Sequence, residues 1–373
     1  MKKLLVIAIC AVLLVGVVAA QTKITLWTQE GTAENAFQYV QSLAAAYAKT
    51  NSKVTFEVLN KETEALREDF QTAALAGNAP ELLWTVSDHA GPFTAADLIQ
   101  PIDKLVDLTK YADASAVMLD GMTWGVPISS GNHLMLLYNK DLVKTAPKDT
   151  DALIKLAAGF NAKGIVTLTF NQTEPFWLVP WLGGYKGRVF AADGKTPTLN
   201  TAAMVSTLQL LQDLKFKHKV LPAEADYNTA DTMFKEGKAA MIINGDWSLG
   251  DYKKVMGDKL GVARIPQVKG GTWPAPYTAG KFFMITKDIE KAKLDAVVAF
   301  IKFATNKANQ LDMFAKLTRL PALKEAAADK TVTSDPITKA SAEQMTVGVG
   351  MPSVIEMRAN WDAMKPELIK VMA

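Results

Sequence analysis

The sequence predicts an α/β protein with two globular units, and three observations support this fold class. A chain of 373 residues, with 49% hydrophobic and 21% charged side chains, is longer than one compact core usually holds. Strand-like and helix-like hydrophobic periods alternate along the chain. This alternation occurs in both halves, and it is typical of sheets that are covered by helices.

The first half of the chain contains a strand, helix, strand unit followed by a similar pattern. Every second residue is apolar in the stretches 24–26 and 54–58, and the segment between them has apolar residues at helical spacing. Such a unit favours parallel pairing of its strands. A helix over 66–74, a Gly-Asn-Ala-Pro break at 77–80 and an apolar strand over 81–84 follow.

The second half repeats this organisation. The predicted elements are, in chain order, a helix over 153–160, a strand over 165–170, a helix over 204–214, strands over 239–243 and 282–285, and a helix over 296–303. The unbroken apolar run at 239–243 suits a strand that is buried on both faces. No Pro- or Ser-rich linker separates the halves, so we expect two lobes joined by several short crossings.

The N-terminus has the order of residues of a secretory signal peptide. Lys2 and Lys3 precede an apolar run over Leu4–Ala20, and polar residues begin at Gln21. A membrane anchor is the alternative, but the run is at the short end of the spanning range. Cys10 lies in the middle of the run rather than at its end, which disfavours lipid attachment. We therefore expect cleavage before Gln21 and a periplasmic or extracellular protein.

Composition excludes several classes of protein. The formal charge is only +3, with 41 Lys and Arg against 38 Asp and Glu, which argues against a nucleic-acid partner. Removing the first 20 of the 373 residues leaves 353 and removes the single cysteine. The mature chain would then have neither a disulfide nor a cysteine nucleophile.

Motifs for nucleotide, hydrolase and metal chemistry are missing from the sequence. Neither a phosphate-binding glycine loop nor the GxSxG elbow occurs. The three histidines, His89, His133 and His218, are too far apart for a zinc site, and we expect them to be ordinary surface or loop residues. The sequence therefore predicts no cofactor, no metal and no catalytic residue.

Aromatic and acidic residues follow several of the predicted strands. They are Trp27 with Glu30, Trp84 with Asp88, Phe176 with Glu174, and Trp247 with Asp246. Loops beyond strand ends are where α/β sheets bind ligands, and flat rings beside carboxylates suit a sugar. Trp27 and Trp84 lie directly on strand ends, so a role in the core is equally expected for them. A glycosidase that uses Glu174 and Asp88 is a further alternative.

Four stretches resemble a known family, in the same order along the chain. The stretch Phe234–Met241 together with Asn244–Trp247 resembles the signature of family 1 extracellular solute-binding proteins. Narrower matches to the maltose-binding members are Leu137–Leu142, Phe170–Asn171 with Glu174–Phe176, and Met351–Pro352 with Met357 and Trp361. The resemblance covers nearly the whole chain after residue 20.

This resemblance implies a periplasmic-binding-protein-like fold, with a ligand cleft between two lobes and delivery of the ligand to an ABC permease. It places the N-terminal lobe at 21–128 with 280–320, and the C-terminal lobe at 129–279 with 321–373. The crossings, and with them the hinge, are expected near 129–132, 278–280 and 319–321. A monomeric binding protein, and not an enzyme, is implied.

The resemblance also implies a set of ligand-binding residues. They are the platforms Phe176, Trp247 and Trp361, the acids Asp88 and Glu174, and Tyr227, together with Glu30, Trp84 and Asn132. Glu30 is one position away from the family's acid, and Trp84 precedes the usual platform position, here Thr85. Phe176 replaces a tyrosine, and the segment around Asn132 lacks the family's cleft glutamate.

These residues predict that the protein binds a carbohydrate, with maltose or malto-oligosaccharides as the leading candidates. A different disaccharide, a glycerol phosphate or a polyamine remains an alternative ligand. A phosphate would require converging arginines or backbone amides, whereas the expected cleft offers mainly acids and aromatics. A polyamine would be attracted by Glu174 and Asp88, so charge alone does not exclude it.

Overall fold

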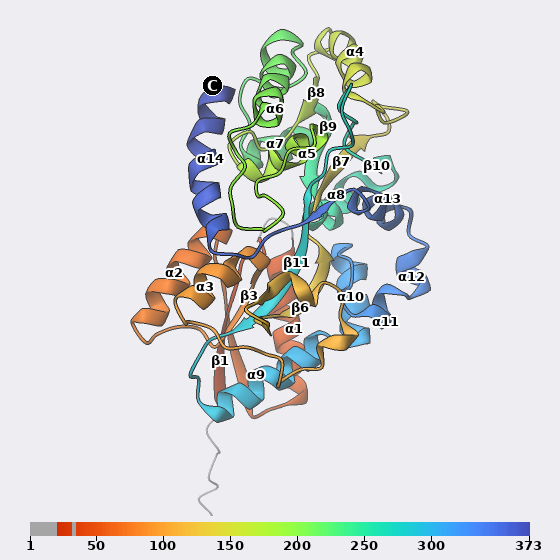
Figure 1. The fold of residues 1–373 in the computed structure, drawn as a ribbon. Helices are drawn as coiled ribbons and strands as arrows, with labels where there is room; N and C mark the ends of the chain where they lie inside the picture. Colours follow the sequence, from red (N-terminus) through yellow and green to blue (C-terminus); the bar gives the residue numbers. More distant parts are fainter. Residues whose placement is uncertain (1–20, 32–34) are drawn as a thin grey trace, which may run out of the picture.

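The computed structural model describes residues 21–31 and 35–373 and arranges them in two α/β lobes, one above the other (Figure 1). The predicted signal peptide, residues 1–20, lies outside the described residues. Each lobe has a β-sheet with helices packed on both faces, which confirms the fold class predicted from the alternating periods. In the described part of the chain, no helix is long and apolar enough to cross a membrane.

The first lobe contains a six-stranded sheet in the order β12-β11-β3-β1-β2, with β6 also paired to β11. These strands are β1 (Thr22–Thr28), β2 (Val54–Asn60), β3 (Leu82–Val86), β6 (Val126–Gly131), β11 (Tyr277–Ile285) and β12 (Val349–Gly350). β1 runs parallel to β2 and β3, as the strand, helix, strand unit predicts. β11 is antiparallel to both β3 and β6, so the sheet is mixed.

Helices cover both faces of this sheet because its strands alternate. Leu82 and Trp84 point to the face that is covered by α1 (Ala36–Thr50), α9 (Lys291–Ala304) and α10 (Lys307–Leu317). Leu83 points to the opposite face, where α2 (Thr63–Leu75) and α3 (Ala90–Ala95) lie. A short hairpin of β4 (Met118–Leu119) and β5 (Met122–Thr123) borders this second face.

The second lobe is built on a four-stranded sheet in the order β10-β7-β9-β8. Its strands are β7 (Leu134–Asn139), β8 (Val166–Thr169), β9 (Ala239–Gly245) and β10 (Leu260–Ala263). Every residue of β9 is buried, as its unbroken apolar sequence predicts. Alternation again divides the core, because Leu136 faces the larger hydrophobic cluster and Leu137 the smaller one.

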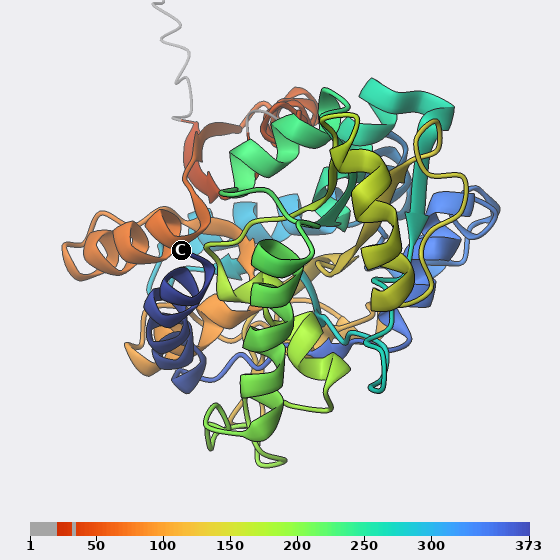
Figure 2. The same cartoon turned by 90° about the horizontal axis from the view of Figure 1, so that it is seen from above.

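The helices of the second lobe follow the same division. The larger cluster includes α4 (Thr150–Asn161), α5 (Val179–Gly184), α6 (Ala202–Gln212) and the C-terminal helix α14 (Glu356–Met372). The smaller one includes α7 (Tyr227–Lys235) and α8 (Leu249–Met256), with α13 (Pro336–Met345) beside β10. The short helices α11 (Lys324–Ala327) and α12 (Lys330–Thr333) precede α13. Seen from above, the dark-blue α14 lies next to the orange helices of the first lobe (Figure 2).

Three chain segments lie side by side at the boundary of the first lobe. Ser130 of β6 pairs with Gly280 of β11, and its backbone N–H donates to the carbonyl of Leu320 at 3.0 Å. These are the segments where the sequence predicts the crossings. The buried cluster of the first lobe continues past the predicted boundary at 320 as far as Ala326.

Candidate ligand-binding site

Aromatic side chains that the sequence predicts as platforms come together in the second lobe. Phe176 follows β8, Trp247 follows β9, and Trp361 lies on α14. The ring centroid of Phe176 is 6.1 Å from that of Trp247 and 6.4 Å from that of Trp361. Tyr227, at the start of α7, accepts a hydrogen bond from Trp247 Nε1 at 3.0 Å. All four side chains are only partly buried, so their rings keep surface that a ligand can contact.

A fifth aromatic residue, Trp177, supports this cluster from beneath. Its side chain is buried, and its Nε1 donates to the carbonyl of Ile243 in β9 at 2.9 Å. Its ring packs edge-on against Trp247 at 6.1 Å and against Tyr227 at 6.0 Å. Sequence reasoning did not assign Trp177, although its position beside Phe176 in a turn after a strand carries the same signal.

Asp88 joins this group from the first lobe. It follows β3, and its Oδ2 accepts a hydrogen bond from Trp361 Nε1 at 3.2 Å. Its other oxygen, Oδ1, is buried and has no hydrogen-bond partner among the described residues. Burial raises the pKa of Asp88, and the Glu64 carboxylate raises it further, to about 6, against the opposing effect of Trp361. The carboxylate thus retains an unused acceptor beside the aromatic cluster.

Glu174 has a cationic partner that the sequence reasoning missed. Its Oε1 forms an ion pair with Lys365 Nζ, and the side chains of Lys365 and Glu174 are 47% and 36% exposed. Lys365 lies one helical turn beyond Trp361 on α14, so the two side chains share a face of the helix. This spacing is the signal in the sequence that could have identified Lys365.

Asn132 lies at the crossing between β6 and β7. Its backbone N–H donates to Oδ2 of Asp246 at 3.0 Å, and its φ of 48° is left-handed. The preceding Gly131 also has a positive φ, of 103°. A Cβ on Gly131 would lie 2.4 Å from Asp246 Oδ2, so the turn requires glycine there. The Asp246 carboxylate thus accepts a hydrogen bond from the backbone at this crossing.

Glu30 and Trp84 are placed differently from the expectation that they face a ligand. Both are about 1% exposed, and Trp84 Nε1 donates to Glu30 Oε1 at 2.7 Å. Glu30 also forms ion pairs with Arg319 and, at 3.4 Å, with Lys281. Burial alone would raise the pKa of Glu30, but the charges of Arg319 and Lys281 outweigh it and lower the pKa to about 2.

The position of Trp84 has a simple physical cause. Strand alternation turns its side chain toward α1 and α9, where it packs edge-on against Phe283 at 5.1 Å. Its ring is therefore part of the core in this structure and does not form a platform. His89 and His133, which we expect to be surface or loop residues, are both buried, although His133 does lie in the loop between β6 and β7. Burial, aided by the charges of Arg67 and Arg358, lowers the pKa of His89 to about 3, so this side chain is neutral at pH 7.

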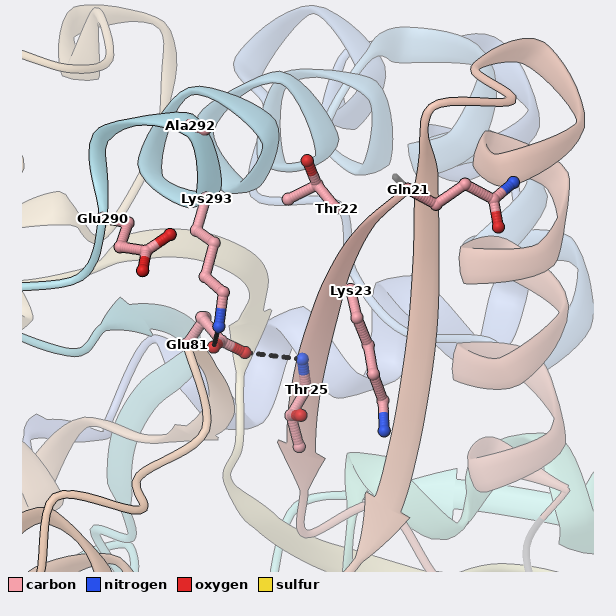
Figure 3. Close-up of a pocket in the computed structure, with 8 residues that line it drawn as sticks. All are labelled: Gln21, Thr22, Lys23, Thr25, Glu81, Glu290, Ala292 and Lys293. Atoms are coloured by element: carbon pink, nitrogen blue, oxygen red, sulfur yellow. Dashed lines mark hydrogen bonds and ion pairs between the residues drawn. The ribbon is translucent and has the colours of Figure 1, made fainter. Parts of the chain in front are cut away.

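A separate pocket of about 390 Å³ lies at the opposite end of β1 (Figure 3). Its lining side chains are charged or polar except for Ala292, and none of them is aromatic. Glu81 accepts a hydrogen bond from the backbone of Thr25 at 2.7 Å and pairs with Lys293 at 2.5 Å. Its composition does not match the aromatic and acidic site described above.

Among the described residues, no cluster of His, Cys, Asp and Glu could hold a metal ion.

The two-lobed fold and the interlobe site define a ligand-binding protein, and the comparisons with known proteins agree. Residues 42–340 match the family model described as "Bacterial extracellular solute-binding protein", and the chain belongs to this family. This confirms the family resemblance and the expectation that the protein is a binding protein and not an enzyme.

Similar proteins are known in sequence and in structure. The maltodextrin-binding protein MdxE of Bacillus subtilis is 29% identical over 87% of this chain and 80% of its own length. A galactooligosaccharide-binding protein of the same organism is 26% identical over 86% of this chain and 79% of its own. The structure of the maltose/maltodextrin-binding domain MalE from Bdellovibrio bacteriovorus, bound to maltotriose, matches with a TM-score of 0.89 and 36% identity, covering 94% of each chain.

Proposed function

We propose that this protein captures a neutral oligosaccharide between its two lobes and delivers it to the permease of an ABC importer. Maltose and malto-oligosaccharides are the leading candidates. The proposed ligand residues are Phe176, Trp247, Trp361, Tyr227, Asp88 and Glu174, with Asn132 at the crossing. The observation that supports this proposal most strongly is the aromatic cluster of Phe176, Trp247 and Trp361, in which Trp361 also donates a hydrogen bond to Asp88 of the other lobe.

Physical chemistry supports a sugar at this site. Ring faces pack against the C–H surfaces of a pyranose, and carboxylate oxygens accept its hydroxyl hydrogens. The unused Oδ1 of Asp88 is an acceptor of this kind. A polyamine is disfavoured because Lys365 already pairs with Glu174. The identity of the sugar rests on relatives that are named for different oligosaccharides.

The proposal also includes secretion of the protein and recognition of its closed form by the permease. Residues 1–20 direct secretion and are removed before Gln21, so the protein acts outside the cytoplasmic membrane. Its proposed oligomeric state is a monomer. Sugar contacts with both lobes favour the closed arrangement, which the permease then recognises. No catalytic step is involved, because binding energy alone shifts the population of lobe arrangements.

Substitution of Trp247 tests the site directly. We expect Trp247→Ala to weaken binding of maltotriose by about 1–3 kcal/mol, because one ring platform and its hydrogen bond to Tyr227 are lost. Isothermal titration calorimetry measures the affinity. A preceding thermal-shift screen over maltose, maltotriose, galacto-oligosaccharides, glycerol phosphate and spermidine identifies the ligand class, since a specific ligand raises the melting temperature by mass action.

Trp273→Ala is the matched control for this experiment. Trp273 is also partly buried, but its ring packs against Arg264, with 5.1 Å between the guanidinium carbon and the ring centroid, and not against the aromatic cluster. The control should retain the affinity of the unmodified protein. Equal affinities for maltotriose in all three proteins would contradict the site, and stabilisation by spermidine alone would contradict the ligand class.

A further inference from the structure

A direct contact between the lobes lies beside the proposed sugar site. Arg358 of α14 forms an ion pair with Glu64 of α2 through its Nη1. The buried face of α2 packs with the first sheet, whereas the buried face of α14 packs with the second. The ion pair therefore joins elements whose hydrophobic cores belong to different lobes. Figure 1 shows α14 standing above α2 and α3 at this edge of the molecule.

Both members of this pair are held in position by neighbours on their own helices. Asp362, one turn along α14, accepts from Arg358 Nε at 3.0 Å and from Nη2 at 2.5 Å. Arg67, on α2, donates through Nε to Glu64 at 3.3 Å. The result is a network of alternating charges across the lobe boundary. A network that fixes its side chains beforehand loses less side-chain entropy than an isolated surface pair does.

The backbone also approaches closely at this edge. Gly91 of α3 lies against the segment before α14, where a Cβ would come within 2.4 Å of the carbonyl oxygen of Ser353. Trp361, three residues after Arg358, donates to Asp88 of the first lobe at 3.2 Å. Arg358 and Trp361 therefore lie on the same face of α14, and each contacts the first lobe.

We propose that Arg358 and Glu64 form an interlobe clasp that stabilises the closed arrangement and thereby raises ligand affinity without either residue touching the ligand. Opening of the lobes would separate the two charges, while each keeps its partner on its own helix. The pair thus distinguishes the two arrangements, as a residue must in order to shift their populations. It also holds Trp361 against Asp88, so Arg358 is a positioning residue.

Scattering without sugar tests the clasp. We expect Arg358→Gln and Glu64→Gln each to increase the radius of gyration measured by small-angle X-ray scattering, because a larger fraction of molecules is open. The double variant should match either single variant, because one pair is removed in each case. Raising the salt concentration should expand the unmodified protein and leave both variants unchanged, because salt screens exposed charges.

Lys291→Gln is the control, since it removes an exposed ion pair with Asp295 within a single helix, α9. This variant should scatter like the unmodified protein at every salt concentration. Identical scattering by all the variants would overturn the clasp. Additive expansion in the double variant would overturn it as well, because the two side chains would then act separately.

Affinity provides the second readout, and only this part rests on the proposed function. Calorimetry with maltotriose should show about 2- to 5-fold weaker binding for Arg358→Gln and for Glu64→Gln, again without additivity, from the usual strength of an exposed pair. If no sugar binds but the scattering changes as expected, the proposed function fails and the clasp stands. If maltotriose binds all variants equally and the scattering does not change, the clasp fails and the proposed function stands.

Discussion

Asp88 carries an energetic cost that a ligand can remove. Its Oδ1 is buried without a hydrogen-bond partner among the described residues, and the bond that its Oδ2 accepts from Trp361 is 3.2 Å long. Burying an unsatisfied acceptor costs about 1–3 kcal/mol. Residues of a binding site often lower the stability of the folded protein in this way, because they are arranged for the ligand. A hydroxyl group of a bound sugar would supply the missing donor.

The pH dependence of stability follows from this cost. Burial and Glu64 raise the pKa of folded Asp88 to about 6, so the folded protein holds this proton more tightly than the unfolded chain does. Its contribution to stability is therefore complete below pH 4 and is lost as the pH rises through 6. We expect Asp88→Asn to increase the free energy of unfolding at pH 7 by about 1–3 kcal/mol. Urea denaturation between pH 4 and 8 measures the difference.

The gain should shrink as the pH falls toward 4, where the carboxyl group is protonated in the folded protein and partly protonated in the unfolded chain. The same variant should bind sugar more weakly, because an amide accepts hydrogen bonds less strongly than a carboxylate does. Glu81→Gln, far from the site, serves for comparison in the sugar titration. A stability difference that stays constant over the whole pH range would show that the ionisation of Asp88 is not its cause.

Glu30 shows what sequence reasoning can and cannot predict about a single residue. Its position just beyond the first strand follows from local alternation, and the structure places it there. Its partner Arg319 is 289 residues away, and no local pattern signals this pairing. Without the cations the buried carboxylate would have a raised pKa, yet with them the pKa is about 2. An acid just beyond a strand end can therefore belong to the core, as Glu30 does, or lie at the proposed ligand site, as Asp88 does.

At the scale of elements, local periodicity predicts the strands and helices well. The helix over Ala36–Thr50 and the buried strand Ala239–Gly245 agree with the sequence patterns, because each pattern depends on nearby residues. The antiparallel placement of β11 between β3 and β6 was not predicted. Its pairing depends on segments far apart in the chain, and an apolar strand suits either direction. Likewise, the contact of α14 with α2 is fixed only when the lobes are in place.

The packing of α3 against the start of α14 gives a prediction at this scale. In Gly91→Ala the new Cβ would overlap the backbone of Ser353 and Ile355, which cannot turn aside as a flexible side chain can. Because the contact joins the lobes, we expect the clash to disfavour the closed arrangement by about 1–3 kcal/mol and to weaken sugar binding accordingly. Calorimetry measures the affinity, and thermal unfolding without sugar measures stability.

Gly159→Ala is the control, because this glycine is also helical and its Cβ would meet no atom within 4 Å. We expect it to leave affinity unchanged and to stabilise the fold by about 0.5–1 kcal/mol. The interpretation of Gly91 as a closure contact predicts a larger effect on affinity than on unfolding. A large loss of stability with unaltered affinity would place the clash within one lobe instead.

At the scale of the whole molecule, neither lobe is formed by one continuous stretch of chain. The first sheet needs β11, which is flanked by β3 and β6, and its core needs α9 and α10. The second lobe in turn needs α14, which contributes Met357, Met364 and Leu368 to the larger cluster. The absence of a linker in the sequence has this physical meaning. Because the three predicted crossings lie side by side, we expect the lobes to rotate about a narrow connection while each core stays intact.

This interleaving predicts which fragments of the protein can fold. Residues 21–128 alone lack β11, α9 and α10, and so keep only α1 of the three helices that cover the face of Trp84. We therefore expect them to remain unfolded. Pro127 on β6 is opposite Phe282 on β11, so a loop of about four Gly, Ser and Asn residues can join position 128 to position 280. Continuing this second piece to 327 includes the buried Ala326, beyond the boundary at 320 that the sequence predicts. The linked fragment should unfold cooperatively in urea, as followed by circular dichroism. A folded 21–128 fragment, or an unfolded linked fragment, would contradict the proposed division of the chain into lobes.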